Sequence, residues 1–218
     1  MSMREKILRY LLLVFGIFFI GLGIAFAKHS NLGISPITSV ANVLSIRFPA
    51  LTVGNWLTVF NCFLILLQIV ILRRNFKPIQ FLQFPISLLL GVFTDLNVAV
   101  VSLVSIDTYI LRLLFVLISV PILAFGITLT VISDTIMNVG EAIVAVFAKI
   151  THKNFGSVKV MFDVSCVVLT IILSVIFFNF KIIGIREGTI ITATLTGLVV
   201  KWLSKRIKEP IINFVKSK

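Results

Sequence analysis

Acidic residues, cysteine and histidine are all scarce in this sequence. The chain of 218 residues has 8 Asp and Glu against 20 Lys and Arg, with two cysteines and two histidines. Cys62 and Cys166 lie in separate apolar runs without a CxxC motif or a Cys/His cluster. Disulfide frameworks and metal centres need such clusters, so we expect neither. The motifs of serine hydrolases, zinc peptidases and phosphate-binding loops are also missing, and we expect no enzyme activity and no cofactor.

Charged residues of both signs together make up only 13% of the chain, whereas 59% of the residues are apolar and the mean hydropathy is +1.15. A soluble domain has about 25% charged residues. The composition therefore excludes a soluble enzyme, a nucleic-acid-binding domain and a secreted disulfide scaffold. In a soluble protein, a net charge of +12 would indicate binding to nucleic acid. In a membrane protein, an excess of Lys and Arg instead marks the loops that lie in the cytoplasm. We expect an all-α protein whose main partner is the lipid bilayer, with no nucleic-acid partner.

Six apolar runs are long enough to cross a membrane, which takes about 20 residues per helix. The gaps at 73–80, 105–109 and 179–187 are short, so neighbouring spans should form antiparallel hairpins. The predicted transmembrane helices cover residues 7–27, 56–72, 81–104, 110–132, 160–178 and 188–203.

Lys and Arg are distributed unevenly between the two sides of this topology. If the N-terminus is cytoplasmic, the cations on the outer side are Lys28, Arg47, Arg112, Lys181 and Arg186, and all the others lie inside. Cytoplasmic loops of membrane proteins carry such an excess of basic residues, which places both termini in the cytoplasm. The basic end of the chain is expected either to lie on anionic lipid as an amphipathic tail or to be solvated.

Two segments, 28–55 and 133–159, are mostly apolar but too short for two spans each. In the first, Ser35 followed by proline predicts a short helix from residue 36 to about residue 46. In the second, Asn138 with Glu141 three positions later is close to a capping box and predicts a helix to about residue 150. Non-helical backbone at membrane depth is tolerated only inside protein or against a cavity. Each segment should therefore hold a re-entrant or an interfacial helix.

The order of elements repeats: span, short capped helix, span, span. A shift of 103 residues aligns Gly23 with Gly126 and Ser35 with Asn138. Each half has three spans, so the second half must be inverted in the membrane relative to the first, a common plan of secondary transporters. The N-termini of the two short helices should then converge near the midplane. The predicted organisation is a first half (1–105), a second half (106–203) and a basic cytoplasmic tail (204–218).

Three short motifs carry a family resemblance. They are Gly-Leu-Gly-Ile-Ala at 21–25, Asn-Leu-Gly-Ile-Ser-Pro at 31–36 and Gly-Asn-Trp at 54–56, and they are similar to those of YczE/YitT-like bacterial integral membrane proteins. The resemblance implies a small multi-pass protein of the bacterial plasma membrane, of poorly defined activity and often guessed to be a transporter. That family commonly has an acidic residue after the proline-containing turn. This chain has Thr38 near that place, and Glu141 in the second half is the candidate for that role.

Polar side chains inside apolar runs are the candidate site residues, because an ionised group at mid-membrane costs at least about 2.5–3.5 kcal/mol. Asp95 lies past the middle of the third predicted span and is followed by Asn97. Asp95 could be a coupling carboxylate, a substrate contact, a protonated acid or the partner of Lys201. Asp163 could act similarly or pair with Lys159, and Asn61, its mate in the repeat, could form an interhelical hydrogen bond.

The leading hypothesis is a secondary transporter for a small polar solute, anionic or zwitterionic, working by alternating access. Helix N-termini carry partial positive charge and free N–H groups, so Ser35 and Asn138 would bind an anionic group. Glu141 or Asp95 would take a cationic group or a coupling proton. The alternatives are a membrane scaffold that transports nothing, and the substrate-binding membrane subunit of an importer with a separate ATPase. A homodimer is possible in each case.

Overall fold

Eight α-helices make up most of the computed structural model, which describes residues 2–216 and has no β-strand in that range. Two 3-10 turns, Arg73–Asn75 and Pro78–Leu82, link the third helix to the fourth. The α-helices are α1 (Met3–His29), α2 (Pro36–Arg47), α3 (Val53–Leu72), α4 (Gln83–Val101), α5 (Tyr109–Ser133), α6 (Val139–Thr151), α7 (Phe155–Phe177) and α8 (Glu187–Lys216).

The all-helical fold class predicted from the sequence is confirmed. Among the described residues, five helices are long and apolar enough to cross a membrane, namely α1, α3, α4 with the turn before it, α5 and α7. These five agree with a multi-pass membrane protein. The sixth predicted span, 188–203, lies in the first part of α8, which continues without a break into the basic segment up to Lys216. Because α8 mixes apolar and charged residues, it is not among the five candidate membrane spans. The presence of six spans stays a prediction.

The two short helices begin in the same way and follow similar breaks. Ser35 before α2 has φ −57° and ψ 148°, and Asn138 before α6 has φ −58° and ψ 148°. The helix before each one ends at a residue with left-handed backbone, Asn31 (φ 55°) after α1 and Asp134 (φ 49°) after α5. Asn and Asp tolerate this conformation better than other side chains with a Cβ, which explains why both long helices stop there.

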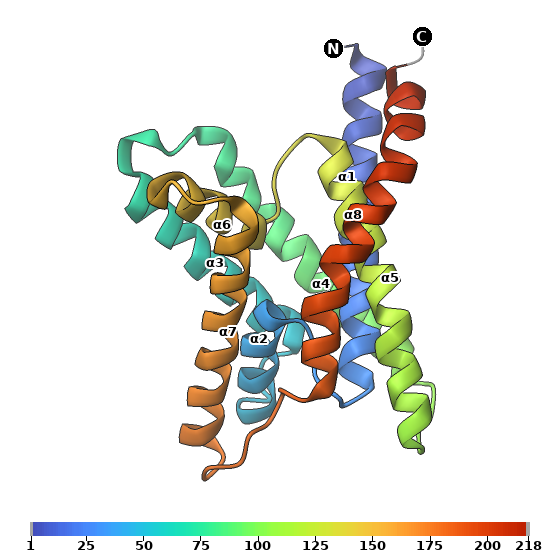
Figure 1. Cartoon of the computed structure of the whole chain (residues 1–218), viewed down its shortest axis with the longest axis vertical. Helices are drawn as coiled ribbons and strands as arrows, with labels where there is room; N and C mark the ends of the chain where they lie inside the picture. Colours follow the sequence, from blue (N-terminus) through green and yellow to red (C-terminus); the bar gives the residue numbers. More distant parts are fainter. Residues whose placement is uncertain (1, 217–218) are drawn as a thin grey trace.

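The helices form two bundles, each built from both halves of the chain (Figure 1). In the scaffold bundle, α1 packs against α4 and α5, and α5 also packs against α8. In the short-helix bundle, α2 and α6 each pack against both α3 and α7. The packing of α3 against α4 joins the two bundles. Both chain ends lie at one end of the molecule, where α1 begins and α8 finishes.

The centre of the scaffold bundle is a close crossing of α1 and α5 at two glycines. A Cβ atom on Gly126 would lie 2.6 Å from the backbone nitrogen of Ile20, and one on Gly23 would lie 2.8 Å from the Cβ of Leu123. No side chain fits between the two helices at these points. Small residues that let backbones approach are the usual means of packing helices in lipid, where the hydrophobic effect does not drive helix association.

A buried arginine links α1 to the end of α5. Arg9 of α1 bonds to Glu5 in its own helix at 3.1 Å and donates from Nη1 to the Ser133 carbonyl at 3.1 Å and to the Asp134 carboxylate at 3.3 Å. The guanidinium thus satisfies a carbonyl at the end of α5 and fixes the break that leads into α6.

We expect Gly126→Ala to destabilise the protein by about 1–3 kcal/mol, because the added methyl would overlap the α1 backbone, which cannot move without repacking the bundle. Thermal unfolding in detergent measures the change. The matched control is Gly197→Ala in α8, where an added Cβ would meet nothing within 4 Å. Equal unfolding temperatures for the two variants would contradict a packed α1–α5 crossing.

Candidate functional site

The first turns of the two short helices contact each other in the short-helix bundle. A Cβ on Gly140, the second residue of α6, would lie 2.6 Å from the Cδ1 atom of Ile37, the second residue of α2. The surroundings are apolar: Val40 of α2, Val139 and Ile143 of α6 and residues of α3 and α7 form one core cluster. Figure 1 shows α6 above α2, and each of them packs against both α3 and α7. Two helix N-termini therefore lie close together in a mostly apolar interior.

Glu141 places a carboxyl beside this contact. It lies in the first turn of α6, and its Oε2 atom is buried without a hydrogen-bond partner among the described residues. The predicted capping box is not what holds the helix start, because the Asn138 Oδ1 atom accepts from the Val139 N–H at 2.9 Å. Burial raises the pKa of the Glu141 carboxyl, and the positive charge of Lys159 on α7 partly opposes this.

Asp163 of α7 is paired within its own helix. The Lys159 ammonium donates to its carboxylate one turn away, with both side chains partly buried. The same two residues are the charged neighbours that act on Glu141. Glu141, Lys159 and Asp163 thus form one charged cluster at the start of α6 and α7. Asn61, the mate of Asp163 in the predicted repeat, is buried on α3, where Phe60 and Leu64 belong to the core cluster that contains Val40 and Ile143.

Asp95 is held at a different place, the start of α3. Its carboxylate accepts from the Gly54 N–H at 2.8 Å and from the Thr52 hydroxyl, which itself caps the helix by accepting from the Asn55 N–H. No contact joins Asp95 to Glu141 or to Lys201 within residues 2–216. A carboxylate at a helix N-terminus satisfies free N–H groups and favours the helix dipole. The structure thus gives Asp95 a structural set of partners.

Asn97 and Ser35 also have structural partners. The Asn97 amide donates to the Phe93 carbonyl of α4 at 2.8 Å and to the Phe18 carbonyl of α1 at 3.4 Å, so it links these two helices. The Ser35 hydroxyl lies 2.9 Å from the hydroxyl of buried Thr38 and does not cap α2 with its side chain. Of the residues predicted from the sequence, Asn138, Glu141 and Asp163 come together, and Asp95 and Asn97 lie elsewhere.

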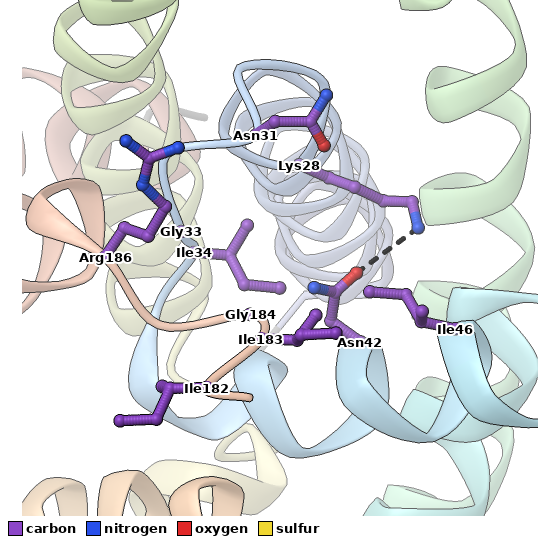
Figure 2. Close-up of a pocket in the computed structure, with 10 residues that line it drawn as sticks. All are labelled: Lys28, Asn31, Gly33, Ile34, Asn42, Ile46, Ile182, Ile183, Gly184 and Arg186. Atoms are coloured by element: carbon purple, nitrogen blue, oxygen red, sulfur yellow. Dashed lines mark hydrogen bonds between the residues drawn. The ribbon is translucent and has the colours of Figure 1, made fainter. Parts of the chain in front are cut away.

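A second polar place, which the sequence reasoning missed, is a hollow at the end opposite the chain termini. It has a volume of about 200 Å³ and lies between the end of α1, the second half of α2 and the loop before α8 (Figure 2). Its polar side chains are Lys28, Asn31, Asn42 and Arg186. The sequence contained one signal for this hollow: Lys28 and Arg186 lie at the outer ends of two predicted spans. Basic residues are less common on that side of a membrane protein than on the cytoplasmic side.

A family model described as Family of unknown function (DUF6198) matches residues 7–205 of the chain. No curated protein and no solved structure matches the chain. This match does not test the resemblance to the YczE/YitT-like proteins, which stays a prediction.

Replacing Asp95 by alanine should lower stability by about 0.5–2 kcal/mol, the usual cost of losing a helix cap, because the Gly54 N–H and the Thr52 hydroxyl lose their acceptor. Thermal unfolding in detergent reads out the loss. Asp107→Ala removes an exposed acid from the α4–α5 loop and serves as the control. If Asp95→Ala unfolds at the temperature of the control, the capping role is wrong.

The raised pKa of Glu141 predicts a pH-dependent stability difference between the wild type and Glu141→Gln. Below the ordinary Glu value of 4.5 the carboxyl is neutral in both the folded and the unfolded chain. Above it the unfolded chain ionises first, so the wild type loses stability relative to Gln until the folded carboxyl ionises too. Unfolding temperatures measured from acid to alkaline pH should show this widening gap. Glu209→Gln, at an exposed position of α8, should show none, and a constant gap for Glu141→Gln would contradict the argument.

Proposed function

Since the chain belongs to the family of unknown function (DUF6198), we propose a function from its own residues: it is a secondary transporter of the plasma membrane for a small anionic or zwitterionic solute. One observation carries the proposal. The first turns of α2 and α6 meet in an apolar interior beside the buried, unpartnered carboxyl oxygen of Glu141. Burying a polar group without a hydrogen-bond partner costs folding free energy, and such a group in a membrane protein often has a functional role.

The chemistry of this meeting point suits a solute with a negative group. N–H groups in the first turn of a helix have no partner within the helix, and the helix dipole adds partial positive charge. Two such ends facing each other attract a carboxylate or a similar group. Glu141 supplies the complementary function: ionised, it attracts an ammonium group, and neutral, it carries a proton. A zwitterion, or an anion moving with a proton, fits this pair of features.

Paired contacts support an inverted repeat of three plus three spans. Gly23 and Gly126 are mates in the predicted repeat, 103 positions apart, and so are Ile20 and Leu123. Gly23 contacts Leu123, and the mates of these two residues, Gly126 and Ile20, also contact each other. The contact of Ile37 with Gly140 joins two residues that are themselves such mates. A two-fold axis in the membrane plane produces this behaviour for residues beside it.

An inverted repeat also provides a way for transport to occur. In inverted-repeat transporters the two halves exchange conformations, so that a fixed midplane site opens alternately to each side. Here the short-helix bundle, joined to the scaffold bundle through α3 and α4, is the part that would rock. Both chain ends lie at one end of the molecule, which suits an even number of spans, with α8 as the sixth and both termini in the cytoplasm (Figure 1).

A specific observation favours a second function, a membrane scaffold that transports nothing. Asp95, Asn97 and Asp163 all satisfy their polar groups within the protein, as structural residues would. On this reading Glu141 is an acid tolerated in the core, and the wild type moves no solute. The two functions therefore differ in whether the wild type shows uptake.

Uptake by the purified protein in liposomes tests the proposal, with labelled amino acids and small organic acids as the probes and a proton gradient, acid outside, as the driving force. We expect one class of probe to enter above the level of empty liposomes. Glu141→Gln should reduce this uptake to that level, because glutamine neither ionises nor carries a proton. Glu209→Gln should leave it unchanged.

One result would contradict the transporter: the absence of uptake for every probe by a protein that unfolds at its normal temperature, which favours the scaffold. Normal uptake by Glu141→Gln would keep the transporter and remove Glu141 from its mechanism.

A further inference from the structure

The hollow at the outer end of the molecule concentrates positive charge that its own lining does not neutralise. Lys28 comes from the last turn of α1, and Arg186 directly precedes α8. No carboxylate is among the described residues that line the hollow. Figure 2 shows the Lys28 and Arg186 side chains on opposite sides of the space, with Ile34 between them.

Each cation keeps donors available for a ligand. The partly buried Lys28 ammonium donates to the Asn42 amide oxygen at 3.3 Å, a neutral partner. Asp95 acts on Lys28 at a distance, but its carboxylate already accepts from α3 and the residue before it. Arg186 uses Nε and Nη2 for the exposed Glu187 carboxylate, at 3.3 and 3.2 Å, which leaves Nη1 for a ligand.

The backbone around the hollow is fixed, so the two cations are held apart. The Gly188 N–H donates to the Leu32 carbonyl at 2.7 Å and ties the start of α8 to the loop after α1. Gly184 has φ 85°, and a Cβ there would lie 2.8 Å from the side chain of Val43 on α2. The loop before α8 therefore packs tightly on both α2 and the α1–α2 connection, and the hollow is a formed site.

We propose that this hollow binds a small organic anion, with its carboxylate attracted by the positive charge of Lys28 and Arg186 and a short apolar chain against Ile34. Arginine and lysine together suit a carboxylate, because Nη1 of the guanidinium can donate to it and the ammonium adds a point charge. The volume of about 200 Å³ suits a small ligand with a short chain.

The site deepens the proposed function and rests on it for its biological role, as the place where solute first binds on the outer side. Binding in detergent needs no transport, so the two proposals can fail separately. Binding of an anion that survives in Glu141→Gln, together with lost uptake, would support both. Binding without any uptake by the wild type would leave the hollow as an anion site and overturn the transporter.

Sodium butyrate is the probe, and thermal unfolding of the full chain in detergent is the readout, at constant ionic strength set with sodium chloride. We expect butyrate to raise the unfolding temperature of the wild type in a saturable way. Lys28→Gln and Arg186→Gln should each raise the apparent Kd at least about tenfold, the effect of losing one charge-assisted hydrogen bond. Lys28→Arg and Arg186→Lys keep the charge and should bind more tightly than the Gln variants.

Lys181→Gln removes an exposed cation from the same loop, outside the hollow, and should bind butyrate like the wild type. Unfolding temperatures without ligand show whether each variant is folded, and the charge-conserving pair keeps the test decisive if a Gln variant is not. Three results would overturn the proposal: no butyrate effect on the wild type, an unchanged Kd in both Gln variants, or equal stabilisation by butylammonium chloride. Stabilisation by inorganic phosphate but not butyrate would overturn the organic carboxylate as the ligand.

Discussion

The close crossing of α1 and α5 is the contact on which the rest of the structure depends. At Gly23 and Gly126 the two backbones approach without a side chain between them, and both short helices follow directly from the ends of this pair. Asn31 follows α1 and Asp134 follows α5, and the left-handed backbone of each residue turns the chain there. Those breaks in turn direct α2 and α6 so that their first turns meet. The buried Arg9, bonded across the end of α5, holds the same arrangement at one end.

Most polar groups inside the apolar helices stabilise the fold. Asp95 caps α3, Asn97 links α4 to α1, and Asp163 pairs with Lys159. This use follows from the surroundings, since lipid offers no hydrogen bonds and a buried polar atom is costly without a partner in the protein. Among the described residues, four buried side-chain atoms lack a hydrogen-bond partner, in Gln68, Glu141, Thr189 and Thr196. Glu141 is the one titratable residue of these four, and it lies at the meeting point of α2 and α6.

Local signals in the sequence were enough to predict where the short helices begin, but they were not enough to predict the roles of single residues. Ser35 with Pro36, and Asn138, were expected to precede the short helices, and these begin at Pro36 and Val139. Capping and proline act over three or four residues, so they can be read from the chain. The partners of Asp95 could not be predicted from the sequence, because Thr52 and Gly54 lie some forty positions earlier. They contact Asp95 only when α3 packs on α4. The Lys159–Asp163 pair, one helical turn apart, was within reach of the sequence.

The sequence by itself determined that this is an all-helical, multi-pass chain, because long apolar runs and helix signals are local properties that packing does not reverse. It also indicated two half-length helices, since their segments are too apolar to be loops and too short to cross twice. Only the tertiary structure decided which polar residues are satisfied and which are not. It also brought Lys28, Asn42 and Arg186 to one hollow, from segments separated by up to about 160 positions. Contacts between such distant residues depend on the path of the whole chain, and no periodicity or motif within one segment records them.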